Sequence, residues 1–265
     1  MPISLPSRER VQGAIFRHLL KNRFPAILLP RDFRLLVQMR RGSSTSFNMT
    51  LSLAYAIKAN LKYRWTPDLI EFARSSRSRF QDDSRSWLVA APYDARSLEL
   101  RRATFHTTHL PRMISTRSLG RAFVRLRNPY DQFRSHSVYL SIQFPGSNAA
   151  ELALDYLTDF AHDLETASGP DIEIVPAETY FTDKSVQLEQ CFNFFGFSEM
   201  TASVAEAIAT YSAFEERWAA LVVDGVMTPR MSYQSEYREI SDEHRQRLDQ
   251  LVQSTIFSEF YSADC

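Results

Sequence analysis

Short apolar runs of strand length recur along this chain, and segments with helical spacing separate most of them. Each run is followed within a few residues by glycine or proline. The runs lie at residues 33–39, 86–91, 103–109, 121–126 and 171–175. Strands that alternate with helices predict a mainly parallel central sheet flanked by helices, the α/β class. Such sheets bind ligands beyond the carboxyl ends of their strands, so the segments after these runs are the candidate sites.

Helices are expected between and after the runs. Pro129 suits the first position of a helix, Asn148 followed by Glu151 is a capping-box pattern, and Gly196 suits a helix end. The expected helices cover about 7–21, a segment reaching about 60, segments starting at 129 and 149, and about 186–195, 202–222 and 242–254. The length of 265 residues suits one large domain or two small ones. We expect a single domain over 1–265, with binding motifs in 33–135 and a mostly helical C-terminal half.

The net charge of zero is the sum of two unlike halves. The chain has 31 Lys+Arg and 31 Asp+Glu. Residues 1–134 hold 25 basic and 9 acidic side chains, which leaves 6 and 22 for residues 135–265. The halves therefore carry +16 and −16, which favours a ligand that meets only the basic half.

The first polar segment at the end of a run is Arg-Arg-Gly-Ser-Ser-Thr at 40–45. Glycine lets the backbone approach a ligand closely, and the N–H groups at a helix start favour an anion. The hydroxyl groups and both arginines add donors. The Gly-Lys-Ser/Thr of the ATP and GTP phosphate loop is missing, so its lysine and Mg²⁺ roles do not transfer. The alternative is a polar turn that caps a helix.

The second segment, Arg-Asn-Pro at 127–129, closes the run at 121–126. Ser135 lies eight residues after Arg127, two turns into the helix expected there. An arginine fork and a hydroxyl group are suited to grip one phosphate from two sides. Taken alone, the pattern also fits a helix start with a solvated arginine.

Together the two segments resemble the sulfotransferase family that uses 3′-phosphoadenosine 5′-phosphosulfate (PAPS). In that family a Lys/Arg-x-Gly-Ser/Thr-Ser/Thr loop binds the 5′-phosphosulfate. A later strand ends in Arg-Asn-Pro, with serine eight residues after the arginine, and binds the 3′-phosphate. The segments at 40–45 and 127–135 match both in order. Thr-His-Leu-Pro at 108–111 looks like the stretch that carries the catalytic base in cytosolic members, and a looser match extends the resemblance to about residue 200.

This resemblance implies a three-layer, P-loop-like fold and in-line transfer of a sulfuryl group from PAPS to an acceptor hydroxyl. His109 becomes the candidate general base, because a neutral imidazole accepts a proton near the operating pH. His106 and His136 are the fallback bases. Arg40 would stabilise charge on the leaving phosphate. The residues implied to contact the donor are Arg40, Arg41, Gly42, Ser43, Ser44 and Thr45 at the 5′ group, and Arg127 and Ser135 at the 3′-phosphate.

Several positions depart from the family pattern. Thr107 replaces the lysine before the histidine, and Ala177 replaces the tyrosine of a Tyr-Glu-Asp region. Thr45 replaces a tryptophan that stacks on adenine, and Phe47 is the nearest aromatic residue. The C-terminal Arg-Lys-Gly segment has no clear copy, for which Arg230 is a weak substitute. The adenine contacts and the C-terminal 3′-phosphate clamp are therefore left open.

Two other classes of function stay in view. One is a nucleotide kinase or NTPase on the same kind of sheet, against which the missing Gly-Lys-Ser/Thr argues. The other is a non-catalytic nucleotide- or nucleic-acid-binding module. The arginines coincide with a two-phosphate constellation and form no basic helix with interleaved aromatic residues, so we expect no nucleic-acid partner.

The remaining expectations concern compartment and partners. The two cysteines, Cys191 and Cys265, make neither a metal spacing nor a disulfide framework, which favours a reducing compartment. The N-terminus has no signal-peptide pattern and no run is long enough to span a membrane, so a cytoplasmic protein is expected. No metal is expected, because fixed cations supply the charge. The acceptor is expected to be a carbohydrate or small metabolite, with its identity and the oligomeric state left open.

Overall fold

A computed structural model describes residues 34–40, 44–60, 90–92, 104–109, 111, 114, 121–167, 171–223 and 239–262, without the side chains of 45, 90–92, 143 and 217–223. Within them, five strands form one parallel sheet in the order β2-β3-β1-β4-β5. The strands are β1 (Arg34–Gln38), β2 (Ala90–Pro92), β3 (Phe105–Thr108), β4 (Arg121–Leu126) and β5 (Asp171–Pro176). The predicted α/β class with a parallel sheet is confirmed.

Each helix expected after β1 is found close to its expected position, and the described residues hold two short helices besides. They are α2 (Ser44–Lys58), α5 (Pro129–Gln143), α6 (Ala149–Glu165), α7 (Thr179–Thr182), α8 (Lys184–Phe194), α9 (Thr201–Val223), α10 (Asp242–Ser254) and the 3₁₀ helix η3 (Ile256–Glu259). The four-residue α7 was not predicted, because one turn carries no helical periodicity. Gly196 ends α8 with a φ of 81°, as expected of a glycine helix end. The predicted helix at 7–21 lies outside the described residues.

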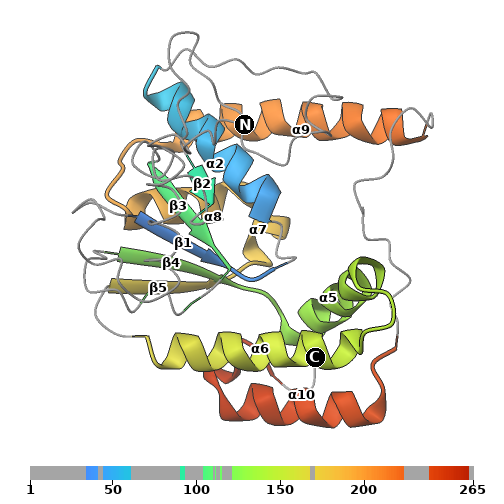
Figure 1. The fold of residues 1–265 in the computed structure, drawn as a ribbon. Helices are drawn as coiled ribbons and strands as arrows, with labels where there is room; N and C mark the ends of the chain where they lie inside the picture. Colours follow the sequence, from blue (N-terminus) through green and yellow to red (C-terminus); the bar gives the residue numbers. More distant parts are fainter. Residues whose placement is uncertain are drawn as a thin grey trace, which may run out of the picture.

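Helices cover both faces of the sheet, which makes three layers (Figure 1). Alternate residues of β1 and β4 point to opposite faces, as the period of a strand requires. Leu35 and Val124 pack with α5, α6 and α10, whereas Leu36 and Phe123 pack with α2, α8 and α9. Burial on both faces explains why the central strands read as continuous apolar runs.

The apolar run at 86–91 is described only in part. Ala90–Pro92 is a strand, and Pro92 belongs to it instead of stopping it, whereas residues 86–89 lie outside the described residues. β2 pairs with β3 alone and forms an edge of the sheet. Proline is tolerated there because its missing N–H faces away from the ladder.

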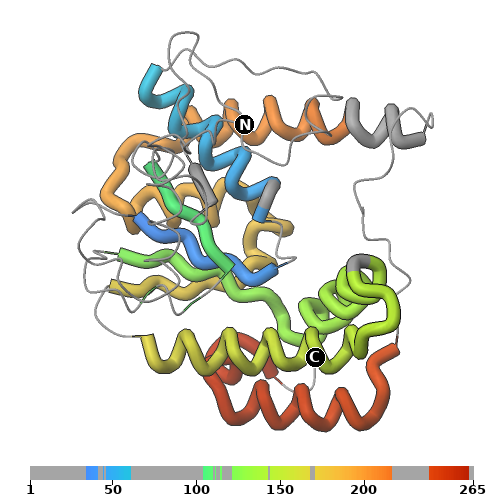
Figure 2. The backbone as a smooth tube through the Cα atoms, in the orientation of Figure 1, coloured from blue at the N-terminus to red at the C-terminus, as the bar shows by residue number. Residues whose placement is uncertain are grey.

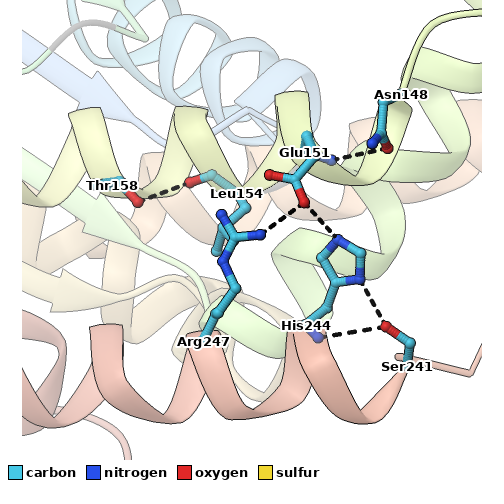
Figure 3. Close-up of polar contacts among 7 residues, drawn as sticks. All are labelled: Asn148, Glu151, Leu154, Thr158, Ser241, His244 and Arg247. Carbon is cyan, nitrogen blue, oxygen red and sulfur yellow. Dashed lines mark hydrogen bonds and ion pairs between the residues drawn. The ribbon is translucent and has the colours of Figure 1, made fainter.

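The start of α6 corrects one detail of the capping prediction. Asn148 caps the helix by accepting the Glu151 N–H at 3.4 Å, as predicted. The Glu151 carboxylate does not return to the cap. It accepts hydrogen bonds from Arg247 at 2.7 Å and from His244 at 3.2 Å, both on α10 (Figure 3). Ser241 caps α10, so this cluster joins two helix starts on the α6 face of the molecule.

We expect Glu151→Gln to lower the melting temperature by about 1–3 °C at pH 7. The hydrogen bond from Arg247 holds the pKa of Glu151 below its usual value, with His244 adding to the effect. A lowered pKa stabilises the fold above the ordinary glutamate pKa of about 4.3, and this contribution is lost as the pH falls through the folded value. The melting temperatures of the wild type and of Glu151→Gln should therefore converge as the pH is lowered from 7 to 3. Glu206→Gln, at an exposed site on α9, is the control, and curves that stay parallel would contradict the role of Glu151.

Candidate functional site

The topology places three residues predicted to belong to the site after the carboxyl ends of neighbouring strands. Strands β3, β1 and β4 are consecutive neighbours, and all three point the same way (Figure 1). Figure 2 shows their backbones side by side in the sheet. His109 follows β3, Arg40 lies just beyond β1, and Arg127 follows β4. The chain leaves β1 into α2 on one face and leaves β4 into α5 on the other (Figure 1). Such a change of face beside the carboxyl ends of neighbouring strands is where open α/β sheets bind ligands.

The imidazole of His109 is fixed against the end of β1. Its Nδ1 lies 2.6 Å from the main-chain oxygen of Gln38, and the side chain is half-buried. A carbonyl oxygen only accepts hydrogen bonds, so Nδ1 carries the proton and donates it. In the neutral ring the lone pair then belongs to Nε2, which is the nitrogen able to take a proton.

The two fallback bases are much less accessible. His106 and His136 have 2% and 1% of their surface exposed. His106 lies within β3, and the His136 ring packs at 4.9 Å against that of Tyr156 on α6. Both rings are buried, whereas that of His109 is half-buried, so His109 is the most accessible of the three candidate bases.

Arg40 is exposed and is held by α6. Its N–H donates to the hydroxyl of Tyr156 at 2.9 Å, and its guanidinium carbon lies 5.2 Å from the centre of the same ring. Burial raises the pKa of the Tyr156 phenol, so the ring stays neutral and its face attracts the cation. Tyr156 thus orients Arg40, and it stands 116 residues away in the sequence.

The loop between β1 and α2 is described at both ends. Ser44 is half-buried and begins α2, and Thr45 lies in its first turn. The first turn of a helix presents backbone N–H groups that have no partner within the helix, which favours an anion. Arg41, Gly42, Ser43 and Arg230 lie outside the described residues.

The turn at Arg127 is shaped by Asn128. The Asn128 side chain caps α5 by accepting the N–H groups of Tyr130 at 3.0 Å and Asp131 at 3.4 Å, and Pro129 takes the first helical position as predicted. The Asn128 N–H donates to Glu178 at 2.7 Å. The sequence Arg-Asn-Pro therefore has a local explanation, since it ends a strand and starts a helix within three residues.

Glu178 ties this turn to the end of the chain. Its second oxygen accepts the hydroxyl of Tyr261 at 2.8 Å. Burial, followed by the negative charge of Glu178, raises the pKa of Tyr261, so its hydroxyl stays a donor. Glu178 comes from the acidic half of the chain and stands beside the basic turn, a placement that the charge count does not predict.

Ser135 is half-buried on α5, two turns beyond Arg127, which agrees with the predicted strand–turn–helix. Arg127 is half-buried at the helix start, and its N–H donates to the sulfur of Met39 at 3.1 Å. This contact joins the end of β4 to the residue before Arg40. That Arg127 and Ser135 bind the same phosphate stays a prediction.

Phe47, the nearest aromatic residue to the loop, is fully buried. One face is covered by the guanidinium of Arg125, whose carbon lies 4.0 Å from the ring centre, and Tyr180 packs edge-on at 5.4 Å. Its position as the fourth residue of α2 therefore serves the core, and its ring is closed to an adenine.

In the part of the chain that the structure describes, no helix is both long and apolar enough to cross a membrane. No group of three or more histidine, cysteine, aspartate or glutamate side chains in it is arranged to hold a metal ion.

Comparisons with known proteins give matches among solved structures alone. No family model matches the chain, and neither does any curated protein. A retinol dehydratase in complex with androsterone and the inactive cofactor PAP is 13% identical, with 91% of this chain and 87% of that chain covered and a TM-score of 0.45. A sulfotransferase from Alicyclobacillus acidocaldarius is also 13% identical, with 72% and 95% covered and a TM-score of 0.33. The solved structures to which this chain is similar thus include a sulfotransferase and a protein in complex with PAP.

Proposed function

We propose that this protein is a PAPS-dependent sulfotransferase that transfers a sulfuryl group to the hydroxyl of a carbohydrate or a small metabolite. One observation supports this most: three neighbouring parallel strands end beside His109, Arg40 and Arg127, with the His109 ring anchored 2.6 Å from the β1 backbone. A proton acceptor thus stands on one side of Arg40 and a second cation on the other. PAPS carries anionic groups at both its 5′ and 3′ positions, and so offers one anionic group to each of the two arginines.

Each residue has a proposed role in binding the donor. Arg40, with Arg41, Gly42, Ser43, Ser44 and Thr45, holds the 5′-phosphosulfate through cations, hydroxyl groups and backbone N–H groups at the start of α2. Arg127 and Ser135 hold the 3′-phosphate. Tyr156 and Glu178 support Arg40 and the Arg127 turn through the contacts described above.

The proposed step is an in-line displacement at sulfur. The acceptor oxygen forms a bond to sulfur while the bond from sulfur to the bridging phosphate oxygen breaks, and that oxygen keeps the electron pair. The acceptor proton moves to Nε2 of His109. Arg40 stabilises the negative charge that develops on the leaving 3′-phosphoadenosine 5′-phosphate (PAP).

The acceptor class and the location are part of the same proposal. An acceptor hydroxyl would give its proton to His109, which lies at the carboxyl ends of the strands. The pockets that select such acceptors are built by loops that differ between enzymes of one fold. A cytoplasmic location is supported by Cys191, a buried free thiol, because structural disulfides are rare in reducing compartments.

We expect PAP to raise the melting temperature by roughly 5 °C or more at a concentration about 100 times its Kd, by mass action. ATP with Mg²⁺ and a single-stranded oligonucleotide are compared at the same concentration, with and without the metal. Stabilisation by ATP-Mg²⁺ and not by PAP would favour a kinase or NTPase, and stabilisation by the oligonucleotide alone would favour a nucleic-acid-binding module. Either result would overturn the proposal.

Assays of labelled sulfate transfer to mixed sugar and metabolite hydroxyls then identify the acceptor class. PAP serves as a product inhibitor in these assays, which checks that the transfer uses the same site. Transfer that PAP does not inhibit would argue against the assigned donor site.

A further inference from the structure

An arginine that the sequence motifs do not include lies buried at the carboxyl end of β4. Arg125 has 1% of its surface exposed and is the register partner of Gln38, the last residue of β1. It points to the face of the sheet that carries Phe123 and α2, by the alternation of the strand. It precedes Arg127 by two residues, about 7 Å along β4. A buried cation therefore stands under the same edge of the sheet as Arg40 and Arg127.

Side-chain amides and aromatic rings are among the groups that hold the guanidinium of Arg125. Its Nε donates to Gln187 on α8 at 2.7 Å, and Nη1 donates to the Gln38 side chain at 2.9 Å. Gln38 donates onward to Asn48 on α2 at 2.7 Å, and Gln187 donates to the main-chain oxygen of Pro176 at 2.6 Å. The network joins the ends of β1, β4 and β5 to the first turns of α2. Amide oxygens fix the direction of the guanidinium without cancelling its charge.

The charge of Arg125 persists in this setting. Burial lowers its pKa to about 10, an effect that outweighs Tyr180, Cys191 and Glu178, which favour the charged form. The side chain therefore stays a cation at neutral pH. Burial also raises the pKa of the Cys191 thiol, which stays uncharged. A cation in a medium of low effective dielectric attracts a nearby anion more strongly than a solvated one does.

We infer that Arg125 is a positioning residue of the donor site, which orients the end of β1 and the start of α2 and adds a buried positive charge beneath the 5′ anion of the bound nucleotide. This inference rests on the proposed function. It assigns the site a further fixed cation, in addition to Arg40, Arg41 and Arg127. The charge of Arg125 attracts the anion through the protein, and Arg125 does not need to contact the ligand.

The test measures the Kd for PAP by calorimetry in Arg125→Gln and Arg125→Lys from pH 6 to pH 9. Both variants lose the fork that binds Gln38 and Gln187, but only the lysine variant keeps a charge. We expect Arg125→Gln to raise the Kd about 10- to 30-fold. Arg125→Lys should bind more tightly than Arg125→Gln at pH 6, because it keeps the charge, and approach Arg125→Gln at pH 9, because burial lowers the pKa of a lysine. Dividing each Kd by that of the wild type at the same pH removes the titration of PAP itself. Tyr180, Cys191 and Glu178 face Arg125, so the comparison of Arg125→Lys with Arg125→Gln, in which they are present alike, carries the result.

A second pair of variants keeps the inference testable if a change at Arg125 prevents folding. Gln187→Glu retains an oxygen acceptor and sets a carboxylate against the guanidinium, whereas Gln187→Met removes the side-chain polarity. Both lose the hydrogen bond to Pro176. Only Gln187→Glu neutralises the buried cation, so we expect it alone to weaken PAP binding, by about tenfold. Arg134→Gln, which loses the ion pair with Asp131 on α5, is the control and should bind as the wild type does.

The outcomes separate the two proposals. A wild-type protein that does not bind PAP overturns the proposed function and this inference with it. A wild-type protein that binds PAP, together with variants of Arg125 that bind equally well, overturns the inference alone. Equal weakening in both members of each pair, with no pH dependence in Arg125→Lys, would show a purely structural role.

Discussion

Replacing His109 with alanine is expected to slow sulfuryl transfer by about 10²- to 10⁴-fold and to leave the Kd for PAP within about twofold of the wild type. The histidine is proposed to act on the acceptor proton and not on the donor, so chemistry and nucleotide binding should separate. Single-turnover transfer with PAPS in excess measures the first, and calorimetry with PAP measures the second. A variant with full activity would move the role of base to another residue.

The contact with Gln38 makes a sharper version of this experiment possible. Asparagine at 109 retains an N–H group that can donate to the Gln38 oxygen, yet it provides no base. His109→Asn should therefore keep the stability of the wild type and be as inactive as the alanine variant. Added imidazole should restore part of the rate in His109→Ala by supplying the missing base.

His162→Ala removes an exposed histidine from α6 and serves as the matched control, with unchanged activity expected. Loss of PAP binding together with activity in His109→Ala would show that the ring merely holds β1 and β3 together. In that case the stability of the variant would fall as well, because the link between His109 and Gln38 is lost.

The secondary structure was predictable where the local pattern was strong. The strand at 121–126 and the helix at 242–254 are found with the predicted bounds, since each has clear apolar spacing and a capping or breaking residue at its end. The end of the edge strand was predicted one residue too early, because Pro92 is typical of a strand breaker although an edge position tolerates it.

The site was predictable as far as the motifs follow strands. Parallel strands end at one edge of the sheet, so His109, Arg40 and Arg127 were expected near one another once their strands were found. The order that sets β1 between β3 and β4 comes from long-range packing, which a local pattern does not contain. That order places the proposed base and the second cation on opposite sides of Arg40.

The supporting residues were not predictable, because their partners are distant in the sequence. Tyr156 meets Arg40 across 116 residues, Gln187 meets Arg125 across 62, and Glu178 meets Asn128 across 50. Each of the three lies in the acidic half of the chain. One signal was available: Arg125 is a charge within an apolar strand, and a buried charge needs an arrangement that holds it.

The division of the chain into a basic and an acidic half therefore reflects more than two surfaces of opposite charge. Apart from Ser135, the groups that would face the nucleotide come from the basic half, and the acidic half supplies Tyr156, Glu178 and Gln187, which orient groups of the basic half. Glu178 shows why the acidic half matters, since it fixes the Asn128 backbone beside Arg127. A ligand with two anionic groups would meet cations whose directions are already set, which reduces the entropy lost on binding.

Replacing Arg127 with alanine is expected to raise the Kd for PAP by roughly 10- to 150-fold, as the loss of charge-assisted hydrogen bonds to a phosphate predicts. The variant should fold normally. Asn128 caps α5 through its own side chain, and the Arg127 contact with Met39 uses the main chain. Calorimetry with PAP measures the effect, and Arg134→Ala on α5 is the control.

Comparison of two ligands shows which phosphate Arg127 serves. Adenosine 5′-phosphate lacks the 3′-phosphate, so its Kd should change little in Arg127→Ala while that of PAP rises. The wild type should thus prefer PAP strongly, and the variant should lose most of that preference. Arg127→Lys keeps the charge but not the fork, and an intermediate preference is expected from it. If both ligands are weakened equally, Arg127 acts on the 5′ group or on the fold, and the assignment of the 3′-phosphate fails.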